Sequence, residues 1–254
     1  LGSIPSDGSS GTFSGLHTNI YRTFNDHKEV RRLSYCKDND AYPEVLNDGR
    51  IVWMRWDYQE RDVNEIFSLW VMYPDGSGSD AFHKVHIKAK KTIQALRDSK
   101  AIEGSEMLVS TGGGHYNYTE GTIVLHNPSL GINEPNSFWN IVPHSSPVLY
   151  GWGDLAAVKE GGVPYVGGYY CKPHGLTEKS FIVSAGYDQP QSNNFQVYYI
   201  DVWGNKELIQ RDKLYETVCA LPVEKREFPT LLPDRSRPEM NHATLYLEDV
   251  YADL

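Results

Sequence analysis

The sequence predicts an all-β fold in which short antiparallel modules recur as the blades of a β-propeller. Three observations support this prediction. The 254 residues include 17 Tyr and 22 Gly, a composition that favours strands and turns. No window shows sustained apolar spacing of three and four residues, so amphipathic helices are not expected. Short strand–turn units recur at irregular intervals of a few tens of residues, which is typical of radial repetition.

The first predicted strands follow a polar start. Residues 1–18 are rich in Gly and Ser and poor in apolar side chains, so we expect a flexible lead-in there. The blades then occupy residues 19–254. Residues 19–24 and 29–34 are predicted to be two strands joined by a hairpin, because a polar turn separates two runs of β-forming residues.

Residues 42–78 form the clearest blade unit. Asn47-Asp48-Gly49 supplies residues that tolerate positive φ in a tight turn. A strand over 50–56 follows, rich in β-branched and aromatic side chains. A second strand over 67–73 ends in the turn Pro74-Asp75-Gly76-Ser77-Gly78.

Comparable units recur after residue 100. Further strands are predicted at residues 102–110, 121–128, 177–187, 195–205 and 206–209. Residues 88–99 are the one segment considered for a helix, and their loose apolar order favours a loop. Residues 127–176, crowded with Pro, Gly, Trp and His, predict a long insertion between blades. About four units are present, so we expect an incomplete portion of a larger propeller.

Composition excludes several kinds of partner. The formal net charge is −9, and the basic residues are dispersed except at Lys88, Lys90 and Lys91, so no nucleic-acid partner is expected. No apolar run approaches the roughly 18 residues of a membrane-spanning helix, so no membrane span is expected. The three cysteines are too few for a disulfide scaffold, and their odd number leaves at least one unpaired within the chain.

Five segments carry a resemblance to a known family. They are PEVLNDGRIVWMRWDY (43–58), SLWVMYPDGSG (68–78), AIEGSEMLVSTGGGHYNYTEGTIVLHNPSLG (101–131), VYYIDVWGNKELIQRD (197–212) and ATLYLEDVYADL (243–254). Together they resemble the TolB-like, or PD40, propeller repeat, with WD40-like blades. More closely, they resemble the hydrazine synthase alpha subunit family. The resemblance implies an extracytoplasmic location, secreted or periplasmic, and an N-terminal propeller followed by further domains, some of which carry haem c.

No cofactor is expected within this chain. Covalent haem attachment requires C-x-x-C-H, which the sequence lacks, so haem c is expected only in downstream domains of a longer parent protein. The sequence also lacks the G-x-S-x-G turn of serine hydrolases and the phosphate-binding P-loop. No catalytic motif is therefore present, and whether the whole protein is an enzyme stays open.

Three functions follow from these observations. In the first, the chain is a non-catalytic extracytoplasmic propeller module of a hydrazine-synthase-alpha-like protein, and it acts in binding, scaffolding or assembly with other protein subunits or domains. In the second, it is the propeller part of a multi-haem c oxidoreductase that joins nitric oxide and ammonium to hydrazine. In the third, it is a glycan-binding propeller in which Trp139, Tyr150 and Trp152 stack on sugars, although core packing explains these residues equally well.

Two pairs of residues are candidates for ligand binding. Arg55 and Asp57 lie at the end of a predicted strand, where they could bind an anion or tie two blades together. His115 and Tyr116 lie in a glycine-rich stretch whose backbone could approach a ligand, or which could be a loop between strands.

The candidate metal ligands are histidines. His83 and His86 are separated by two residues and could share a helical face, and His115 is a third candidate. A metal site needs three or four ligands at suitable spacing, so a solvated histidine pair is the competing interpretation.

Overall fold

The computed structural model describes residues 2–6, 17–24, 28–56, 67–83, 95–113, 121–142, 168–187, 194–237 and 239–242. Across these ranges the chain folds into fifteen strands and two short 3₁₀ helices, Pro128–Leu130 and Pro135–Ser137. The strands are β1 (Gly2–Ser6), β2 (His17–Thr23), β3 (Val30–Arg32), β4 (Asn39–Val45), β5 (Ile51–Trp56), β6 (Phe67–Met72), β7 (Asp80–His83), β8 (Ala95–Ala101), β9 (Leu108–Gly113), β10 (Thr122–His126), β11 (Phe138–Asn140), β12 (Tyr169–Thr177), β13 (Ser180–Gly186), β14 (Gln196–Asp201) and β15 (Lys206–Gln210). No helix in these ranges has the length and hydropathy needed to cross a bilayer.

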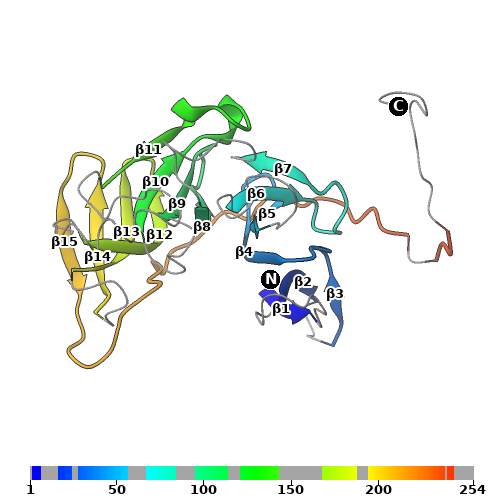
Figure 1. The fold of residues 1–254 in the computed structure, drawn as a ribbon, viewed down its shortest axis with the longest axis horizontal. Coiled ribbons are helices and arrows are strands. Elements are labelled where there is room, and N and C mark those ends of the chain that lie inside the picture. Colours follow the sequence, from blue (N-terminus) through cyan, green and yellow to red (C-terminus); the bar gives the residue numbers. More distant parts are fainter. Residues whose placement is uncertain are drawn as a thin grey trace, which may run out of the picture.

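The strands form four consecutive antiparallel blades. The second, third and fourth blades are β4–β7, β8–β11 and β12–β15, and the first comprises β1–β3. Single residue pairs join neighbouring blades: Thr18 with Asn39, Phe67 with Ala95, and Gly121 with Tyr170. Figure 1 shows the blades arranged as an arc, which the described strands do not close into a ring. The prediction of an incomplete all-β propeller with about four units is confirmed.

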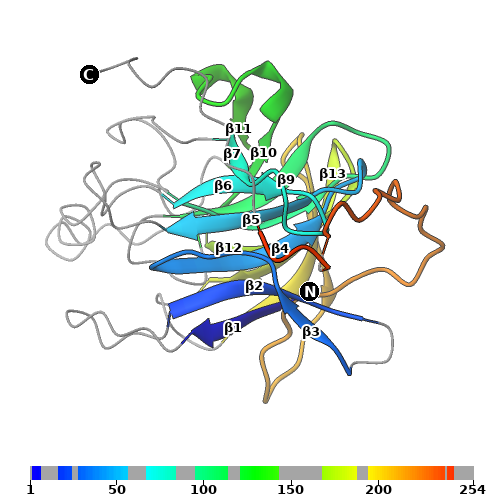
Figure 2. The same cartoon turned by 90° about the vertical axis from the view of Figure 1, so that its right-hand side faces the viewer.

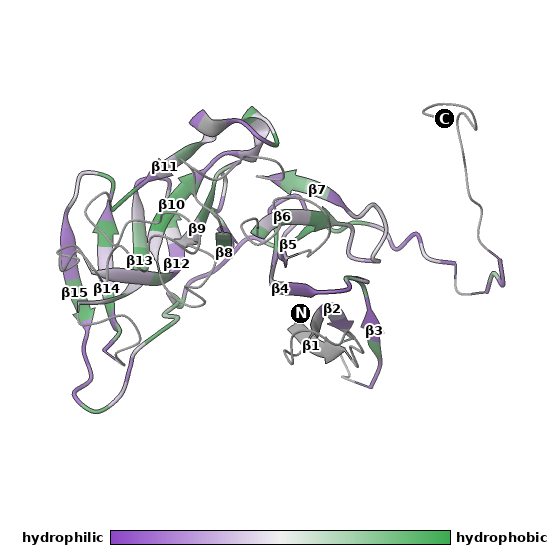
Figure 3. Ribbon diagram, viewed as in Figure 1, coloured by the Kyte–Doolittle hydropathy of each residue, from purple (hydrophilic) through white to green (hydrophobic). Residues whose placement is uncertain are grey.

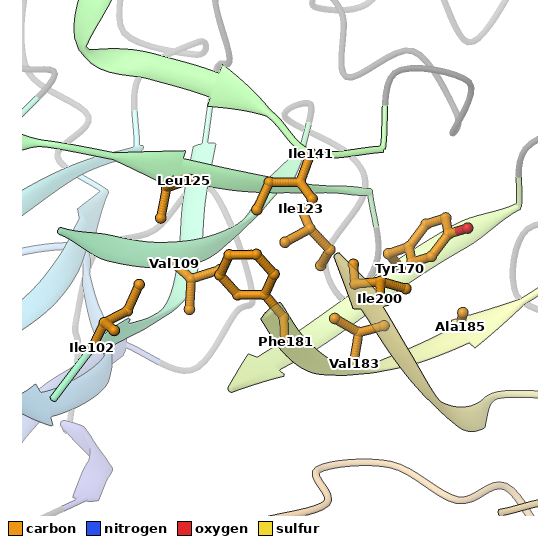
Figure 4. Packing of buried hydrophobic residues seen from close by; sticks show 10 residues of the cluster. All are labelled: Ile102, Val109, Ile123, Leu125, Ile141, Tyr170, Phe181, Val183, Ala185 and Ile200. Carbon is orange, nitrogen blue, oxygen red and sulfur yellow. The ribbon is translucent and has the colours of Figure 1, made fainter. Parts of the chain in front are cut away.

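The hydrophobic core lies between the blades. The largest cluster fills the space between the third and fourth blades and is shown in Figure 4. There, Val109 and Ile123 of the third blade meet Phe181 of the fourth, and all three are fully buried. Burying one such side chain stabilises the fold by about 1.5–3 kcal/mol. Two further clusters join the first blade to the second and the second to the third.

The predicted Asp-Gly turns occur where the sequence places them. Between β4 and β5, Leu46 N donates to Arg50 O at 2.8 Å, and Gly49 has a φ of +88°. Between β6 and β7, Ser77 N donates to Asp75 Oδ1 at 2.9 Å. In the first turn, Arg50 N likewise donates to Asp48 Oδ1 at 2.9 Å, so each Asp side chain closes its own turn.

Three segments differ from the sequence prediction. The expected lead-in over residues 1–18 contains β1, which pairs with β2 through backbone groups and so needs no apolar side chains. The expected loop over 88–99 contains the start of β8. The expected insertion over 127–176 contains β11 and most of β12, which belong to blades, while residues 143–167 of it lie outside the described ranges. Both β8 and β12 are first strands of blades, where polar side chains replace the alternating pattern used for prediction.

A segment without strands or helices, residues 211–237, runs back across the blades and is called the strap below. Its backbone is held by one blade after another. Thr217 N donates to Phe195 O of the fourth blade at 2.8 Å, and Thr230 N to Asn47 O of the second at 3.1 Å. Figure 2 shows the strap, in orange to red, along one side of the blades. The strap thus ties together blades that are distant in sequence.

The strap also reaches the third and first blades. Glu227 N donates to Glu103 Oε1 in the β8–β9 turn at 3.3 Å. Near the end of the strap, Arg31 on β3 donates to Ser236 Oγ at 3.0 Å and lies 3.7 Å from the Asp234 carboxylate.

Candidate functional site

The first strands of the second, third and fourth blades, β4, β8 and β12, contact one another in series and form the inner side of the arc. Figure 3 draws β4 almost entirely in purple, because this inner strand is hydrophilic. Each inner strand changes register against its neighbour at the same place, and the two-residue bulges are Tyr42-Pro43, Asp98-Ser99 and Lys172-Pro173. Bulges of this kind re-aim side chains.

The first residue of every bulge has a left-handed backbone. The φ angles of Tyr42, Asp98 and Lys172 are 55°, 50° and 50°. This conformation costs roughly 1–2 kcal/mol for a residue with a Cβ. Strained residues of this kind cluster at functional sites. Three equivalent strained positions therefore mark the inner strands as the candidate site.

The bulges bring these three side chains together. Lys172 Nζ lies 2.5 Å from Asp98 Oδ1 and 5.1 Å from the centroid of the Tyr42 ring. The backbone is tied as well, since Lys172 N donates to Thr111 Oγ1 at 3.1 Å. The Lys172–Asp98 ion pair thus connects the fourth blade to the third. The Tyr42 ring of the second blade lies beside it.

The surroundings shift the pKa values of two of these groups. Burial raises the pKa of Tyr42, and the negative charge of Asp98 raises it further. Burial lowers the pKa of Lys172, but the charge and hydrogen bond of Asp98 outweigh burial, so the net pKa is raised. Near neutral pH, Tyr42 is therefore a neutral hydroxyl and Lys172 an ammonium ion.

A cavity of about 150 Å³ opens at this cluster. It is lined by Tyr42, Pro43, Asp98, Ser99, Lys100, Lys172, Pro173, Cys219 and Leu221, and is called the inner-strand cavity below. Cys219 and Leu221 come from the strap. Cys219 has a φ of 63°, so all four non-glycine residues with positive φ in the described ranges line this one cavity.

Further charged side chains lie close to the Lys172–Asp98 pair. Lys100 Nζ forms an ion pair with Glu44 Oε2. The pKa of His174 is lowered, mainly by burial and then by the positive charge of Arg226 in the strap. Asp98 and Glu44 are thus each held by a lysine. The arrangement suits the binding of a polar group better than it suits proton transfer or nucleophilic attack.

Arg55, predicted as a ligand-binding residue, is bound within its own blade. Its Nε and Nη2 donate to the two carboxylate oxygens of Asp40 at 2.7 and 2.8 Å. Trp53 Nε1 donates to Asp40 Oδ1 at 2.8 Å, and the guanidinium lies 4.4 Å from the Trp70 ring centroid. The pair therefore joins β4 to β5 within the second blade. Asp57, the predicted partner of Arg55, lies outside the described residues.

His83, predicted as a metal ligand, is buried against a histidine of the next blade. Its ring stacks on that of His126, with centroids 5.2 Å apart and an interplanar angle of 10°. His83 Nε2 lies 3.2 Å from Ser137 Oγ, and His126 Nε2 lies 2.7 Å from Ser110 Oγ. Throughout the described ranges, no group of three or more His, Cys, Asp or Glu side chains is placed to hold a metal ion.

The other predicted site residues, His86, His115 and Tyr116, lie outside the described part of the chain, as do Tyr150 and Trp152. Trp139 is half-exposed on β11.

The Ser110–His126 contact is not an accessible catalytic pair. Both side chains are fully buried. Burial, and after it electrostatic repulsion from the neighbouring His83 ring, holds the pKa of His126 well below its usual range. A substrate has no access to Ser110 in this conformation.

The cysteines do not fit the haem c that the family resemblance implies for the whole protein. Covalent attachment uses two cysteines separated by two residues, followed by a histidine. Cys36, Cys171 and Cys219 are far apart in the sequence, and Cys36 and Cys171 are buried. These three cysteines therefore do not provide the paired thiols of a haem c attachment site.

A second, larger hollow of about 330 Å³ lies where the turns of the second and third blades meet. Its apolar wall includes Leu46, Phe82 and Met107. Asn47 also lines it, and the same residue holds the strap at Thr230. The hollow and the strap are therefore neighbours on one side of the molecule.

Sequence reasoning missed Asp98, Lys172 and Cys219. A signal exists in retrospect for the two bulge residues, because each precedes the turn of its hairpin by five or six positions, as Tyr42 does. An apolar residue also stands four positions after each bulge residue: Leu46, Ile102 and Leu176. For Cys219, no local pattern places the strap against the inner strands.

The structure is similar to that of Kuenenia stuttgartiensis hydrazine synthase, with a TM-score of 0.57 and 14% sequence identity over 84% of this chain. The likeness covers 26% of that chain, so this chain spans about a quarter of its length. Tricorn protease is matched over 81% of this chain and 24% of that chain, at a TM-score of 0.32 and 11% identity. No protein-family model and no curated protein matches the sequence. At these identities the hydrazine synthase likeness shows the propeller fold alone.

Proposed function

We propose that this chain is a non-catalytic propeller module of a larger extracytoplasmic protein, and that it acts in binding, scaffolding or assembly with other domains or subunits. The observation that carries this proposal is a set of large apolar side chains exposed along the strap. They are Leu214, Tyr215, Val223, Phe228 and Leu231. The exposed fraction is 94% for Phe228 and 91% for Leu231. Exposed apolar side chains that gather along one segment in this way mark a candidate interaction site.

The backbone of the strap is held in place by the blades beneath it. Hydrogen bonds at Thr217, Glu227 and Thr230 hold it against three blades, so its apolar side chains project outward from an anchored chain. The neighbouring hollow lined by Phe82 and Met107 extends the apolar surface. A partner can therefore bury side chains from the strap and insert its own beside them.

The polar groups of the inner-strand cavity support a non-catalytic role. Lys172 and Lys100 are each paired with a carboxylate, and the raised pKa of Lys172 keeps its amine protonated. A protonated lysine is no nucleophile. The extracytoplasmic location and the larger parent protein are drawn from the family resemblance.

A second candidate function is the propeller part of a hydrazine-synthase-type oxidoreductase with haem c in other domains. The likeness to hydrazine synthase over 84% of this chain favours it. In such an enzyme, the joining of nitric oxide and ammonium to hydrazine takes place on domains beyond these residues. This chain then shapes access to them and supports their assembly.

The assembly role is tested on the protein in its native source. We expect Phe228→Ser/Leu231→Ser to reduce the mass of the complex measured by light scattering after mild purification. The matched control is Val202→Ser/Trp203→Ser, which removes exposed apolar side chains of the β14–β15 turn, away from the hollow and from residues 228–231, and is expected to leave the mass unchanged. A strap variant with the wild-type mass would overturn the proposal.

The two candidates are separated by the denatured mass and the Soret absorbance of the native protein. A mass well above 28.8 kDa with covalent haem supports the oxidoreductase. A native protein without covalent haem contradicts the oxidoreductase candidate and leaves the binding or assembly module as the proposed function.

A further inference from the structure

Cys171 and Cys219, far apart in sequence, approach the same serine. Cys171 on β12 is paired directly with Ser184 on β13. Residues opposite each other in an antiparallel pair project from the same face, with Cβ atoms about 4.5–5.5 Å apart. Ser184 Oγ in turn accepts a hydrogen bond from Cys219 N at 3.1 Å. The strap backbone at Cys219 therefore lies on the face of the fourth blade from which Cys171 projects.

A second contact fixes the strap on this face. Thr217 N donates to Phe195 O at 2.8 Å, two residues before Cys219. The Phe195 side chain packs with Cys171 and Tyr169 in a small buried cluster. The strap thus crosses the edge of the cluster that contains the Cys171 thiol.

A third observation places Cys219 on the β12 side of Ser184. Cys219 lines the inner-strand cavity together with Lys172 and Pro173, the two residues that follow Cys171. The three observations converge on one region, in which the strap lies beside β12. Disulfides require Cα atoms within about 7 Å of each other, and a strap resting on the neighbouring residue allows this approach.

We propose that Cys171 and Cys219 form a disulfide under oxidising conditions, which fixes the strap to the fourth blade at the wall of the inner-strand cavity. Both side chains are thiols in the structure, Cys219 exposed and Cys171 buried. The oxidant is a small disulfide such as oxidised glutathione. The Cys219 thiolate attacks it and releases one reduced glutathione, and the Cys171 thiolate then displaces the second from the mixed disulfide. Two thiols lose two electrons and two protons, and one glutathione disulfide becomes two thiols.

The Cys171–Cys219 disulfide would determine how firmly the strap forms one wall of the inner-strand cavity. Oxidation holds Cys219 and the nearby Leu221 against the bulge at Lys172. Reduction leaves this part of the strap held by backbone hydrogen bonds from Thr217 and Cys219. Access to the Lys172–Asp98 pair then depends on the redox state.

The third cysteine is an internal control. Cys36 is buried two blades away, with its N donating to Asn19 Oδ1 at 2.8 Å and its Sγ 3.7 Å from Trp56 O. It should stay a thiol while the other two are oxidised.

The test uses the full purified chain, reduced and then incubated with oxidised glutathione. The sample is quenched in acid, denatured, labelled with N-ethylmaleimide and analysed by intact mass and peptide mapping. The chain has three cysteines, so we expect three labels before oxidation, and afterwards one label on Cys36 with a linked Cys171–Cys219 peptide. Cys219→Ser should abolish the link and Cys36→Ser should preserve it.

Hydrogen exchange gives a second readout that needs no substitution of the buried Cys171. Amides of residues 213–221 should exchange at least about tenfold more slowly in the oxidised wild type than in the reduced protein, because local opening is suppressed. A stable glutathione adduct on Cys219 with Cys171 labelled, or a link to Cys36, overturns the proposal. So does equal exchange in a sample in which mapping shows the Cys171–Cys219 link.

Discussion

Lys172 and Asp98 occupy the same bulge position in two successive blades, and Lys172 Nζ lies 2.5 Å from Asp98 Oδ1. The ion pair thus connects two repeats through residues that the repeat itself makes equivalent. Asp98 is 8% exposed, so its carboxylate depends on this partner.

Lys172→Met tests the contribution of this pair to stability. We expect the free energy of unfolding to fall by about 1–3 kcal/mol, because a buried carboxylate loses its cation. Urea denaturation measures the change. The control is Lys213→Met, on an exposed position of the strap, which is expected to change stability by less than about 0.5 kcal/mol. Equal effects of the two variants would contradict a role for the pair.

Arg55→Met should destabilise the second blade more strongly. The Asp40 side chain is completely buried and receives two hydrogen bonds from Arg55. Removing the cation leaves a buried charge, which costs about 3–5 kcal/mol. The matched control is Arg50→Met, because its pair with Asp48 is about one-third to one-half exposed and contributes about 1 kcal/mol or less. Both are measured by urea denaturation, and a loss at position 55 no larger than that at position 50 speaks against the buried pair.

Gly49→Ala tests how the strap is seated on the second blade. A Cβ at Gly49 would lie 1.9 Å from Thr230 O, and the φ of +88° adds backbone strain. We expect trypsin to cleave the strap at Lys225 or Arg226 faster in this variant. Gly204→Ala in the β14–β15 turn is the control, since its φ of +91° gives similar strain while its Cβ would meet nothing within 4 Å. Equal cleavage rates in the two variants would show that Thr230 does not hold the strap.

Acid should destabilise the interface of the second and third blades. The pKa of His126 in the folded state is well below 6.5, because of burial and of electrostatic repulsion from His83. No hydrogen-bond partner reaches His126 Nδ1 in the described part of the chain. The unfolded state therefore binds more protons than the folded state below about pH 6.5. Stability is fully present above this pH and falls by about 1.4 kcal/mol for each pH unit below it.

Urea denaturation at pH 7.5, 6.5 and 5.5 measures this dependence. The variant His126→Gln keeps a polar side chain beside Ser110 and removes the titrating group. We expect its stability to change less between pH 6.5 and 5.5 than that of the wild type. An unchanged slope would assign the acid sensitivity to other groups.

The sequence was sufficient to predict the outer parts of the blades. Asn47-Asp48-Gly49 and the turn at Asp75 determine their hairpins locally, since the side chains and the glycines satisfy the turn themselves. The strand from Ile51 to Trp56 was equally clear, because its β-branched and aromatic residues pack between blades. Turn residues and runs of β-forming side chains act within a few positions of one another, so they can be recognised in the sequence.

The inner strands and the strap could not be predicted in the same way. β8 contains Arg97 and Asp98, which are buried against Phe67 of the second blade and Lys172 of the fourth, and no local pattern predicts these partners. The stacked pair of His83 and His126 forms across a blade interface. Only the assembled arc defines these contacts, so the candidate site appeared in the structure while the predicted site residue Arg55 proved to be bound within its blade.

The strap's hydrogen bonds are arranged in series along the chain, with no more than three to any blade. A pulling force applied at residue 237 would load these hydrogen bonds one after another, which is the unzipping geometry. The strands of a blade instead share a load over several neighbouring backbone bonds. The molecule therefore has a built-in order of mechanical failure, in which the strap detaches at low force before any blade unravels.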